Sequence, residues 1–448
     1  MSKAHIKKQR ASNTIVKNIT TVGISHEGRG ITHVDGKIAF IQDALANENI
    51  DYEILREKKE YTEGKLTALH NASRDRVAPA CTHYAYCGGC SLQHMASDAQ
   101  VLFKQQMLME LLEKIGRCAP TEILPPVTGP VQHYRNKARL SVRFVRGKGG
   151  HLVGFREKNN GRYIADISSC EILHKKVGQH LLALRELLSQ FEQPECIAQI
   201  EIAAGDEEVA LIFRNLTDLR DSEEILLKNF AQTSGFRVYL QPGGYDSIFM
   251  LHPEKNNDLL CYSLSDYGIK FWFHPADFTQ VNAEINQKMV NQALELLQLD
   301  EDDSVMDLFC GLGNFSLPIA TRCKHVIGME GSSMMVERAQ MNAKHNELSN
   351  TEFYIRDLFA ENCLHKKEIQ MVNKMLIDPP RSGAYEVVKQ LKNSSITHLL
   401  YVSCNPATLA RDADILVHQA GYRLQSAGVM DMFPHTAHVE SMALFERV

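Results

Sequence analysis

Long apolar runs are missing from this chain of 448 residues. No window approaches the ~18 uninterrupted apolar residues that a membrane-spanning helix needs, so we expect no membrane partner. The basic segment 1–17 is not followed by an apolar stretch, which argues against a secretory signal and predicts a cytoplasmic protein. At roughly 100–200 residues per domain, the length predicts two to four globular domains.

Cysteines do not occur in the pattern of a disulfide-stabilised protein. The chain has eleven, an odd number, and no export signal precedes them. Disulfides are therefore not expected, and metal binding or catalysis is the favoured use of these thiols.

An excess of positive charge is also missing, since the formal net charge is −5. Taken alone, this argues against a nucleic-acid partner. The cations are nevertheless concentrated in segment 1–40, with seven Lys or Arg against two acids, and in segment 131–165, with nine against one. Such local basic stretches predict directed phosphate contacts, although a solvated basic face would look the same.

Three regions with different patterns follow one another along the chain. Segment 1–70 has short β-branched strands at 14–19, 30–33, 37–41 and 49–58, punctuated by glycines, which predict a small RNA-binding β-barrel of the OB type. Segment 71–270 carries a cysteine cluster, a helical pattern at 101–116, basic strands at 137–146, a helix near 176–191 and further strands around 197–214 and 236–251, which predict an α+β domain.

Segment 271–448 alternates strands with helices. Strands are expected at 304–309, 325–330, 351–357, 375–378 and 398–403, and helices fit between them. This is the pattern of a doubly wound, mostly parallel α/β sheet. Two last strands at 421–432 and 441–446 have no helix between them and predict an antiparallel hairpin at the edge.

A glycine loop follows the first of these strands, at 307–316. Gly311 and Gly313 permit a tight turn close to a ligand, and Glu330 ends the next strand, where a carboxylate accepts ribose hydroxyl hydrogens. A dinucleotide site prefers a third glycine, but Ser316 stands there. The loop therefore suits S-adenosylmethionine, which has no phosphate, and Asp357 is placed to accept from an adenine amino group.

Cys404 differs from the other isolated cysteines because Asn405 and Pro406 follow it at a strand end. A thiolate that adds to C6 of uracil makes C5 nucleophilic enough to take a methyl group, and a base must then remove the C5 proton. Glu440 is the best candidate for that base, with His435 and His438 as alternatives. The remaining isolated thiols are interpreted as buried apolar residues: Cys118, Cys196, Cys261, Cys323 and Cys363.

Three close cysteines, Cys81, Cys87 and Cys90, and a distant fourth, Cys170, form the predicted metal site. Four thiolates suit either zinc or an iron–sulfur cube. The second C-x2-C pair of a zinc knuckle is missing, so the spacing favours [4Fe–4S].

Four segments resemble those of the RNA uracil-C5 methyltransferases: DLFCGLGNFSLP, IDPPRSG, SCNPATLARD and FPHTAHVE. The similarity extends over essentially the whole chain and is greatest to the type that acts on bacterial large-subunit (23S) ribosomal RNA. It implies a TRAM-like barrel (1–70), a central iron–sulfur domain (71–270) and a Rossmann-like methyltransferase domain (271–448), in a monomer with no DNA partner. It also implies a set of site residues: nucleophile Cys404, base Glu440, cofactor contacts Gln280, Phe309, Asn314, Glu330, Asp357 and Asp378, and cluster ligands Cys81, Cys87, Cys90 and Cys170.

RNA contacts are expected in segment 134–139, which combines an aromatic residue with three cations, and Phe278 is expected to stack on a base or on the cofactor. Neutralising Arg135 or Lys137 should weaken RNA binding. Two other hypotheses remain, a methyltransferase for a different substrate and a non-catalytic RNA-binding or iron–sulfur module. The Cys404 motif argues against the first of these, and the intact cofactor loop against the second.

Overall fold

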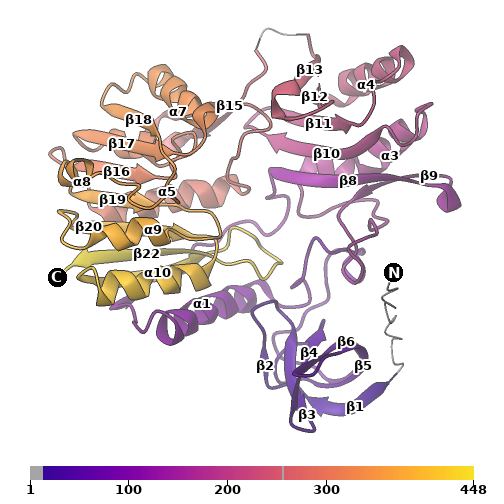
Figure 1. Cartoon of the computed structure of the whole chain (residues 1–448). Coiled ribbons are helices and arrows are strands. Elements are labelled where there is room, and N and C mark those ends of the chain that lie inside the picture. Colours follow the sequence, from indigo (N-terminus) through magenta and orange to yellow (C-terminus); the bar gives the residue numbers. More distant parts are fainter. Residues whose placement is uncertain (1–13, 255–256) are drawn as a thin grey trace, which may run out of the picture. The chain divides into compact units, whose positions relative to one another are not determined.

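The computed structural model describes residues 14–254 and 257–448. Lys3, Lys7, Lys8 and Arg10 of the predicted basic N-terminal stretch lie outside the described residues. The chain forms two compact units (Figure 1). Unit 1 comprises Met1–Tyr84, Cys90–Phe103 and His435–His438, and unit 2 comprises the rest of the chain.

Unit 1 contains a six-stranded sheet in the order β1-β5-β6-β4-β3-β2, and the strands predicted in segment 1–70 are confirmed. Its core consists of Ala39, Ile41, Ala44, Ile50 and Tyr52. The strands are β1 (Ile15–Thr20), β2 (Gly23–Ile24), β3 (Gly30–Val34), β4 (Lys37–Gln42), β5 (Asn49–Glu57) and β6 (Tyr61–Asn71).

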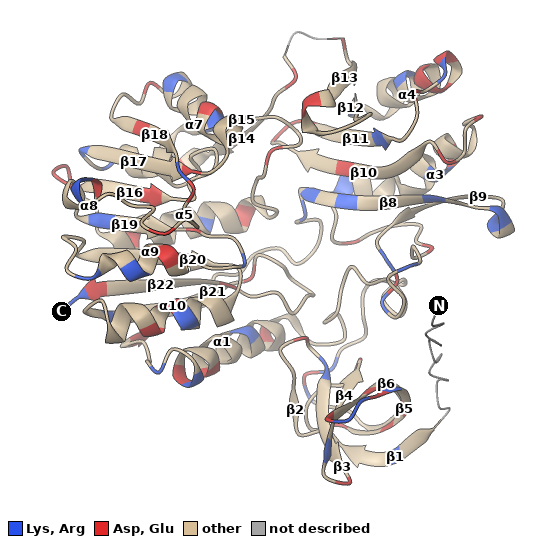
Figure 2. Ribbon diagram, in the orientation of Figure 1, with Lys and Arg blue, Asp and Glu red and all other residues tan. Residues whose placement is uncertain are grey.

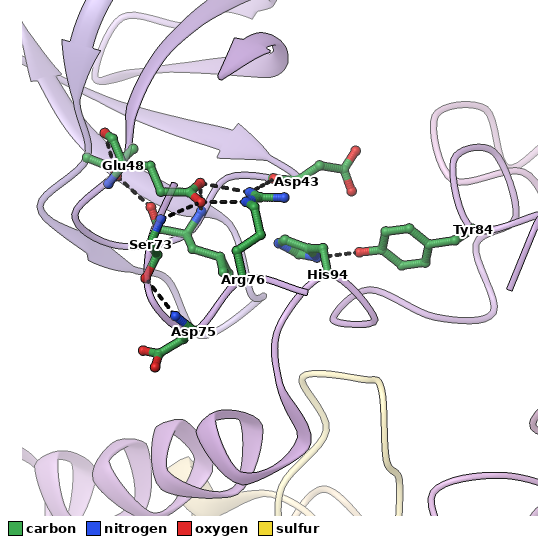
Figure 3. A network of polar contacts seen from close by, with 9 residues as sticks. Asp43, Glu48, Ser73, Asp75, Arg76, Tyr84 and His94 are labelled. Atoms are coloured by element: carbon green, nitrogen blue, oxygen red, sulfur yellow. Dashed lines mark hydrogen bonds and ion pairs between the residues drawn. The ribbon is translucent and has the colours of Figure 1, made fainter. Parts of the chain in front are cut away.

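An ion pair between Arg76, which follows β6, and the buried Glu48, which precedes β5, holds the segment after this sheet against it (Figure 3). The Glu48 carboxylate accepts hydrogen bonds from Arg76 Nε at 2.5 Å and Nη2 at 2.7 Å, and from the Leu45 N–H at 2.7 Å. Burial raises the pKa of Glu48, but the contacts to Arg76 and to backbone N–H groups outweigh it, so the pKa lies below its ordinary value. The same view shows Tyr84 and His94, whose hydroxyl and Nδ1 lie 2.6 Å apart.

The first sheet of unit 2 has the order β13-β12-β11-β10-β8-β9. The strands and the helix near 176–191 predicted for this region are confirmed, and α4 was not foreseen. The strands are β8 (Lys137–Val145), β9 (Gly150–Gly154), β10 (Ile197–Ala204), β11 (Val209–Asn215), β12 (Arg237–Leu240) and β13 (Phe249–His252). The helices are α2 (Lys175–Gln179), α3 (Leu181–Ser189) and α4 (Asp221–Ser234).

The second sheet of unit 2 has the order β18-β17-β16-β19-β20-β22-β21-β7. Its strands are β16 (Ser304–Leu308), β17 (His325–Glu330), β18 (Thr351–Ile355), β19 (Lys374–Ile377), β20 (His398–Ser403), β21 (Tyr422–Met430), β22 (Glu440–Arg447) and the short β7 (Glu122–Ile123). The five strands from β16 to β20 are parallel, which confirms the predicted doubly wound pattern. Strands β21 and β22 form the predicted antiparallel pair, but the edge belongs to β7 because its backbone pairs with β21.

Helices flank this sheet, as Figure 1 shows. They are α5 (Ala283–Leu297), α6 (Ser316–Ala320), α7 (Ser333–His345), α8 (Lys366–Gln370), α9 (Tyr385–Val388) and α10 (Pro406–His418). Helix α1 (Ser97–Lys114) confirms the helix expected at 101–116, and β14 (Leu260–Leu264) pairs with β15 (Ile269–Phe273) in a separate small sheet. Among the described helices, none has the length and apolar character needed to cross a membrane.

Candidate active site

The sheet order brings the ends of β19, β20 and β22 to one edge. Because β22 runs antiparallel to β20, it begins where β20 ends, and Ser403 pairs with Ser441. The next residue on each strand is Cys404 and Glu440. The register therefore places the predicted nucleophile opposite the predicted base, although 36 residues separate them in the sequence.

Local hydrogen bonds hold the loop that carries Cys404. The Asn405 side chain caps α10 by accepting from the Ala407 N–H at 3.2 Å, and Pro406 occupies the first turn, where its missing N–H is not needed. Asn405 Nδ2 also donates to the Arg381 carbonyl at 2.9 Å. The loop after β20 is thus fastened to the loop after β19, which brings Arg381 to the same edge.

Burial controls the protonation of this edge. Burial and, after it, the carboxylates of Glu440 and Asp378 raise the pKa of the Cys404 thiol, the Arg381 guanidinium lowers it, and the result is a pKa of about 11. Burial followed by the Asp378 charge lifts the pKa of Glu440 well above its ordinary value, and burial alone raises the pKa of Asp378 to about 7. The pKa values of Cys404 and Glu440 therefore both depend on the charges of Asp378 and Arg381.

The glycine loop after β16 has the tight geometry that the sequence predicts. Gly311 and Gly313 have φ angles of 56° and 94°, and Phe309, with φ 62°, is a bulky residue in the left-handed region. Such a conformation is costly for a side chain of this size and is typical of functional loops. Asp307 and Ser316 close the base of the loop with a 2.5 Å hydrogen bond.

Glu330 stands beside this loop at the end of β17. Its carboxylate accepts from the Ser332 N–H at 2.9 Å and from the Gly311 N–H at 3.3 Å. The carboxylate is thereby oriented at the carboxyl edge of the sheet, next to the glycine loop. This is the position in which an acidic residue contacts a ribose in related sheets.

Asn314 is held by two residues that the sequence did not single out. Its Oδ1 accepts from Tyr262 OH at 2.9 Å and from Asn286 Nδ2 at 3.0 Å, and its Nδ2 donates to Asn286 Oδ1 at 2.8 Å. Most of its amide is therefore engaged in fixing the loop. A polar residue, Asn286, within the buried face of α5 was the signal in the sequence that could have revealed this clamp.

Asp357 follows β18 and is exposed. Its Oδ1 accepts from the Phe359 N–H at 3.0 Å, which orders the turn. The Phe359 ring, about half exposed, lies 5.5 Å from the Phe309 ring at an interplanar angle of 52°. An acidic side chain and two aromatic rings thus come together at the carboxyl edge of the sheet, and Phe359 was not predicted.

The buried residue Asp277 holds the segment that carries Gln280 in place. The Asp277 carboxylate accepts from the His274 N–H at 2.7 Å, from Arg338 Nε at 3.1 Å and from Tyr245 OH. Phe278 is 68% exposed, as a residue that stacks on a ligand must be. Val281, the neighbour of Gln280, shares a core with Leu312 and Phe315 of the glycine loop.

Two cations of segment 134–139, where β8 begins, contact other parts of the protein. Lys137 Nζ donates to the Pro275 carbonyl, and burial lowers the pKa of Lys137 to about 8. The Arg135 guanidinium donates to the Lys137 carbonyl at 3.2 Å and lies over the Phe155 ring. Both predicted phosphate contacts therefore have partners within the protein.

The predicted metal ligands were tested by geometry and by donor chemistry. Four thiols are suitable donors for an iron–sulfur cluster. Cys87 Sγ accepts from the Gly89 N–H at 3.5 Å, and Cys170 is buried against Gly178, where a Cβ would approach the Cys170 carbonyl to 2.2 Å. Within the described residues, however, no group of three or more His, Cys, Asp or Glu side chains is arranged to hold a metal ion.

Comparison with known proteins supplies independent information. Residues 97–448 match the family model for tRNA (uracil-5-)-methyltransferase. The curated 23S rRNA (uracil(1939)-C(5))-methyltransferase RlmD of Legionella pneumophila (strain Lens) is 54% identical over 95% of this chain and 96% of its own length. The protein of that name from Alcanivorax borkumensis is 48% identical over 95% of each chain.

A solved structure has the same overall fold. The tRNA (uracil-54, C5)-methyltransferase of Pyrococcus abyssi, in complex with S-adenosyl-L-homocysteine, superimposes with a TM-score of 0.72 at 22% identity and covers 96% of this chain and 100% of its own. This similarity confirms the predicted α/β methyltransferase fold.

Proposed function

Because the chain belongs to the tRNA (uracil-5-)-methyltransferase family, we propose that it transfers a methyl group from S-adenosylmethionine to C5 of a specific uridine in 23S ribosomal RNA. Family membership makes it an enzyme of the methyltransferase class. The relatives at 54% and 48% identity, which match along almost their whole length, support the ribosomal substrate. The observation that carries the proposal is the position of Cys404 and Glu440, which directly adjoin the paired residues Ser403 and Ser441 at the ends of two antiparallel strands.

Cys404 acts as the nucleophile. Its thiolate adds to C6 of the target uracil, and the electron pair of the C5–C6 bond moves toward the ring carbonyl, so that C5 becomes nucleophilic. S-adenosylmethionine supplies the electrophilic methyl group that C5 attacks. A uridine in folded RNA must leave its stack to reach a thiol at the edge of this sheet.

Glu440 acts as the base that completes the reaction. After C5 is methylated, its carboxylate removes the C5 proton, the C5–C6 double bond re-forms, and Cys404 leaves as a thiolate. The burial that raises the pKa of Glu440 also makes its carboxylate a stronger base than an exposed glutamate. His435 and His438 stay as alternatives until Glu440 is replaced.

The cofactor is proposed to bind at the glycine loop. Glu330 accepts hydrogen bonds from the ribose hydroxyls, and Asp357 accepts a hydrogen bond from the adenine amino group. Asn314, which is hydrogen-bonded to Asn286, fixes the conformation of the loop. An acidic edge suits a sulfonium ligand because opposite charges attract. The remaining proposed contacts come from the loops around this edge: Gln280, Phe309 and Asp378.

The central domain is proposed to carry a [4Fe–4S] cluster on Cys81, Cys87, Cys90 and Cys170. The support is the family resemblance and the chemistry of four thiols. Anaerobic purification should yield four iron and four acid-labile sulfide per chain, Cys87→Ser should lose them, and the control Cys196→Ser should keep them. Zinc in place of iron, or no metal at all, would refute this part of the proposal.

The proposed organisation is a TRAM-like RNA-binding barrel at 1–70, the central domain at 71–270 and the catalytic domain at 271–448, in a monomer. The barrel proposal rests on the six-stranded sheet of unit 1. If the barrel binds RNA, deletion of 1–70 should weaken RNA binding, and sedimentation should give the mass of one chain.

The decisive experiment measures 5-methyluridine. The purified protein is incubated with S-adenosylmethionine and 23S ribosomal RNA from a strain that lacks it, and the nucleosides are analysed by mass spectrometry. We expect 5-methyluridine with the wild type and with Cys118→Ala, and none with Cys404→Ala. Transfer RNA from a strain without its own uridine methylation is tested in parallel, and product there alone would move the substrate from ribosomal to transfer RNA.

A further inference from the structure

One face of the first sheet of unit 2 carries arginines in a regular arrangement. Strand β8 alternates strictly: Leu140 and Val142 are buried, whereas Arg139 and Arg143 are exposed, and the Arg139 side chain is 67% exposed. Figure 2 shows Lys and Arg at several positions along β8 and at its turn into β9. Because side chains alternate across a strand, these two arginines share one face.

A third arginine joins them from β11. The register pairs Ser141 of β8 with Gln199 of β10, and Gln199 with Arg214 of β11, so Arg214 lies on the same face. Arg214 is exposed although the residues on either side of it are buried. We call the set of Arg139, Arg143 and Arg214 the arginine face.

The opposite face of the sheet is covered. His151 of β9 pairs with Phe144 of β8, and its Nδ1 lies 3.5 Å from Ser189 Oγ at the end of α3. Helix α4 contacts β12 and β13. The arginine face is therefore the side of the sheet that α3 does not cover.

Only one of the three arginines has an acidic partner among the described residues. Arg139 pairs with Glu201 at 2.7 Å, and within the described residues neither Arg143 nor Arg214 forms an ion pair. The Glu201 side chain is only 14% exposed, so the pair is not a surface ion pair, but a guanidinium has five N–H donors and Arg139 can contact a phosphate while it stays paired. The face thus presents guanidinium groups that are available to a polyanion.

The arginine face leads directly to the catalytic edge. At the start of β8, the Asn136 N–H donates to the Val281 carbonyl at 2.7 Å, next to Gln280. On the same face, Ala203, Ile212 and Tyr239 are buried in the core that also contains Leu312 and Phe315 of the glycine loop. One strand therefore links the exposed arginines to the segment that carries the proposed cofactor contact Gln280.

We infer that the arginine face binds phosphate groups of the RNA backbone that flank the target uridine. This inference rests on the proposed function, since it deepens the substrate of the same site. At about 3.3 Å per residue, Arg139 and Arg143 lie about 13 Å apart along β8, and at about 4.8 Å per strand Arg214 lies about 10 Å from Ser141. These spacings are too wide for one phosphate, so each arginine contacts a different phosphate group.

The number of contacts sets the expected salt dependence. Each phosphate contact contributes about 0.7 to the slope of log K against log salt for a single strand, and about 0.9 for a duplex. Replacing all three arginines with glutamine should therefore lower the slope by about 2 for a single strand and by about 3 for a duplex, and should raise KM for RNA. The value of kcat at saturating RNA should stay at the wild-type level, because no atom of the three side chains enters the reaction.

The test compares this triple variant, R139Q/R143Q/R214Q, with the charge-matched control K228Q/K324Q/K344Q. The control lysines lie on α4, before β17 and on α7. Binding of transcribed 23S ribosomal RNA is measured from low to high salt, together with 5-methyluridine formation. We expect the reduced slope in the arginine variant alone, with thermal melting of both variants close to wild type.

A wild-type slope in the arginine variant would overturn the inference, and so would an equal loss in the control, because the effect would then reflect net charge. If the arginine variant instead loses a protein partner and keeps its RNA slope, the face belongs to that partner and the inference fails. Absence of 5-methyluridine with the wild-type enzyme is a separate result, because it refutes the proposed function.

Discussion

Replacing Glu440 with glutamine should make Cys404 more reactive while it stops turnover. Cys404 and Glu440 adjoin the paired residues Ser403 and Ser441, and residues opposite each other on antiparallel strands have Cβ atoms about 5.5 Å apart. At an effective dielectric constant of about 20, two unit charges at that distance repel by about 3 kcal/mol, or about two pKa units. Water at the edge screens part of this, so we expect the pKa of Cys404 to fall by about one unit from about 11.

The assay is alkylation of Cys404 by iodoacetamide as a function of pH, followed by mass spectrometry of the peptide. Because a thiolate reacts and a thiol does not, the alkylation profile of Glu440→Gln should move about one unit to lower pH. Methylation turnover should fall by about 10²–10⁴-fold, the usual contribution of a general base, and a covalent RNA adduct should accumulate. An unshifted alkylation profile would refute the placement of the carboxylate beside the thiol.

Two further predictions concern positioning and stability. Asn286→Ala removes two of the three hydrogen bonds of the Asn314 amide and leaves only that from Tyr262. The affinity for S-adenosylmethionine should therefore fall about tenfold while Cys404 alkylation stays unchanged, as titration calorimetry and alkylation would report. Lys104→Met removes the ammonium that lies 2.6 Å from the buried Asp431 carboxylate and leaves that charge unpaired. Urea unfolding should show that the free energy of unfolding falls by about 3–5 kcal/mol. Adding Asp431→Leu to this variant should restore much of the lost stability.

The catalytic sheet could be predicted from the sequence because its parallel strands are short apolar runs that end in special residues. Strands β16, β19 and β20 are almost entirely buried, and the glycine loop, Asp378 and Cys404 follow directly after them. Since the carboxyl ends of such strands meet at one edge of the sheet, the sequence alone predicts that these residues lie together. The pairing of Cys404 with Glu440 required one more fact, the register of β22, which the sequence does not state.

Other features depend on contacts that no local pattern reveals. The clamp of Asn314 by Tyr262 and Asn286 joins three segments, and the sequence hints at it only through one polar residue, Asn286, on the apolar face of α5. The interpretation of Lys137 as an RNA ligand came from a local cluster of cations beside an aromatic residue, whereas the fold buries its amine against the Pro275 carbonyl. The arginine face was equally hidden, because Arg214 joins Arg139 only through the strand order.

The buried acid of the glycine loop gives a prediction about pH and stability. Asp307 is fully buried, Ser316 donates to its Oδ2, and its Oδ1 has no hydrogen-bond partner among the described residues. Burial raises the pKa of Asp307 to about 7, against about 3.9 for an unfolded aspartate. Between these values the folded protein binds a proton that the unfolded chain does not, so the contribution of Asp307 to stability decreases by about 1.4 kcal/mol for each unit that pH rises, and it levels off above about pH 7.

Histidines also titrate in this range, since burial lowers the pKa of His151, His174 and His274, and their effect on stability has the opposite sign. The difference between the wild type and Asp307→Asn cancels them, because both proteins keep these histidines. Asparagine stays neutral at every pH. The free energy of unfolding of the variant minus that of the wild type should therefore increase by about 2–3 kcal/mol from pH 5 to pH 7. Urea unfolding at several pH values measures this difference. If the difference in free energy of unfolding stays constant from pH 5 to pH 7, Asp307 is already ionised in the folded protein. The carboxyl edge of the sheet then carries the negative charge of Asp307 in addition to that of its other acidic residues.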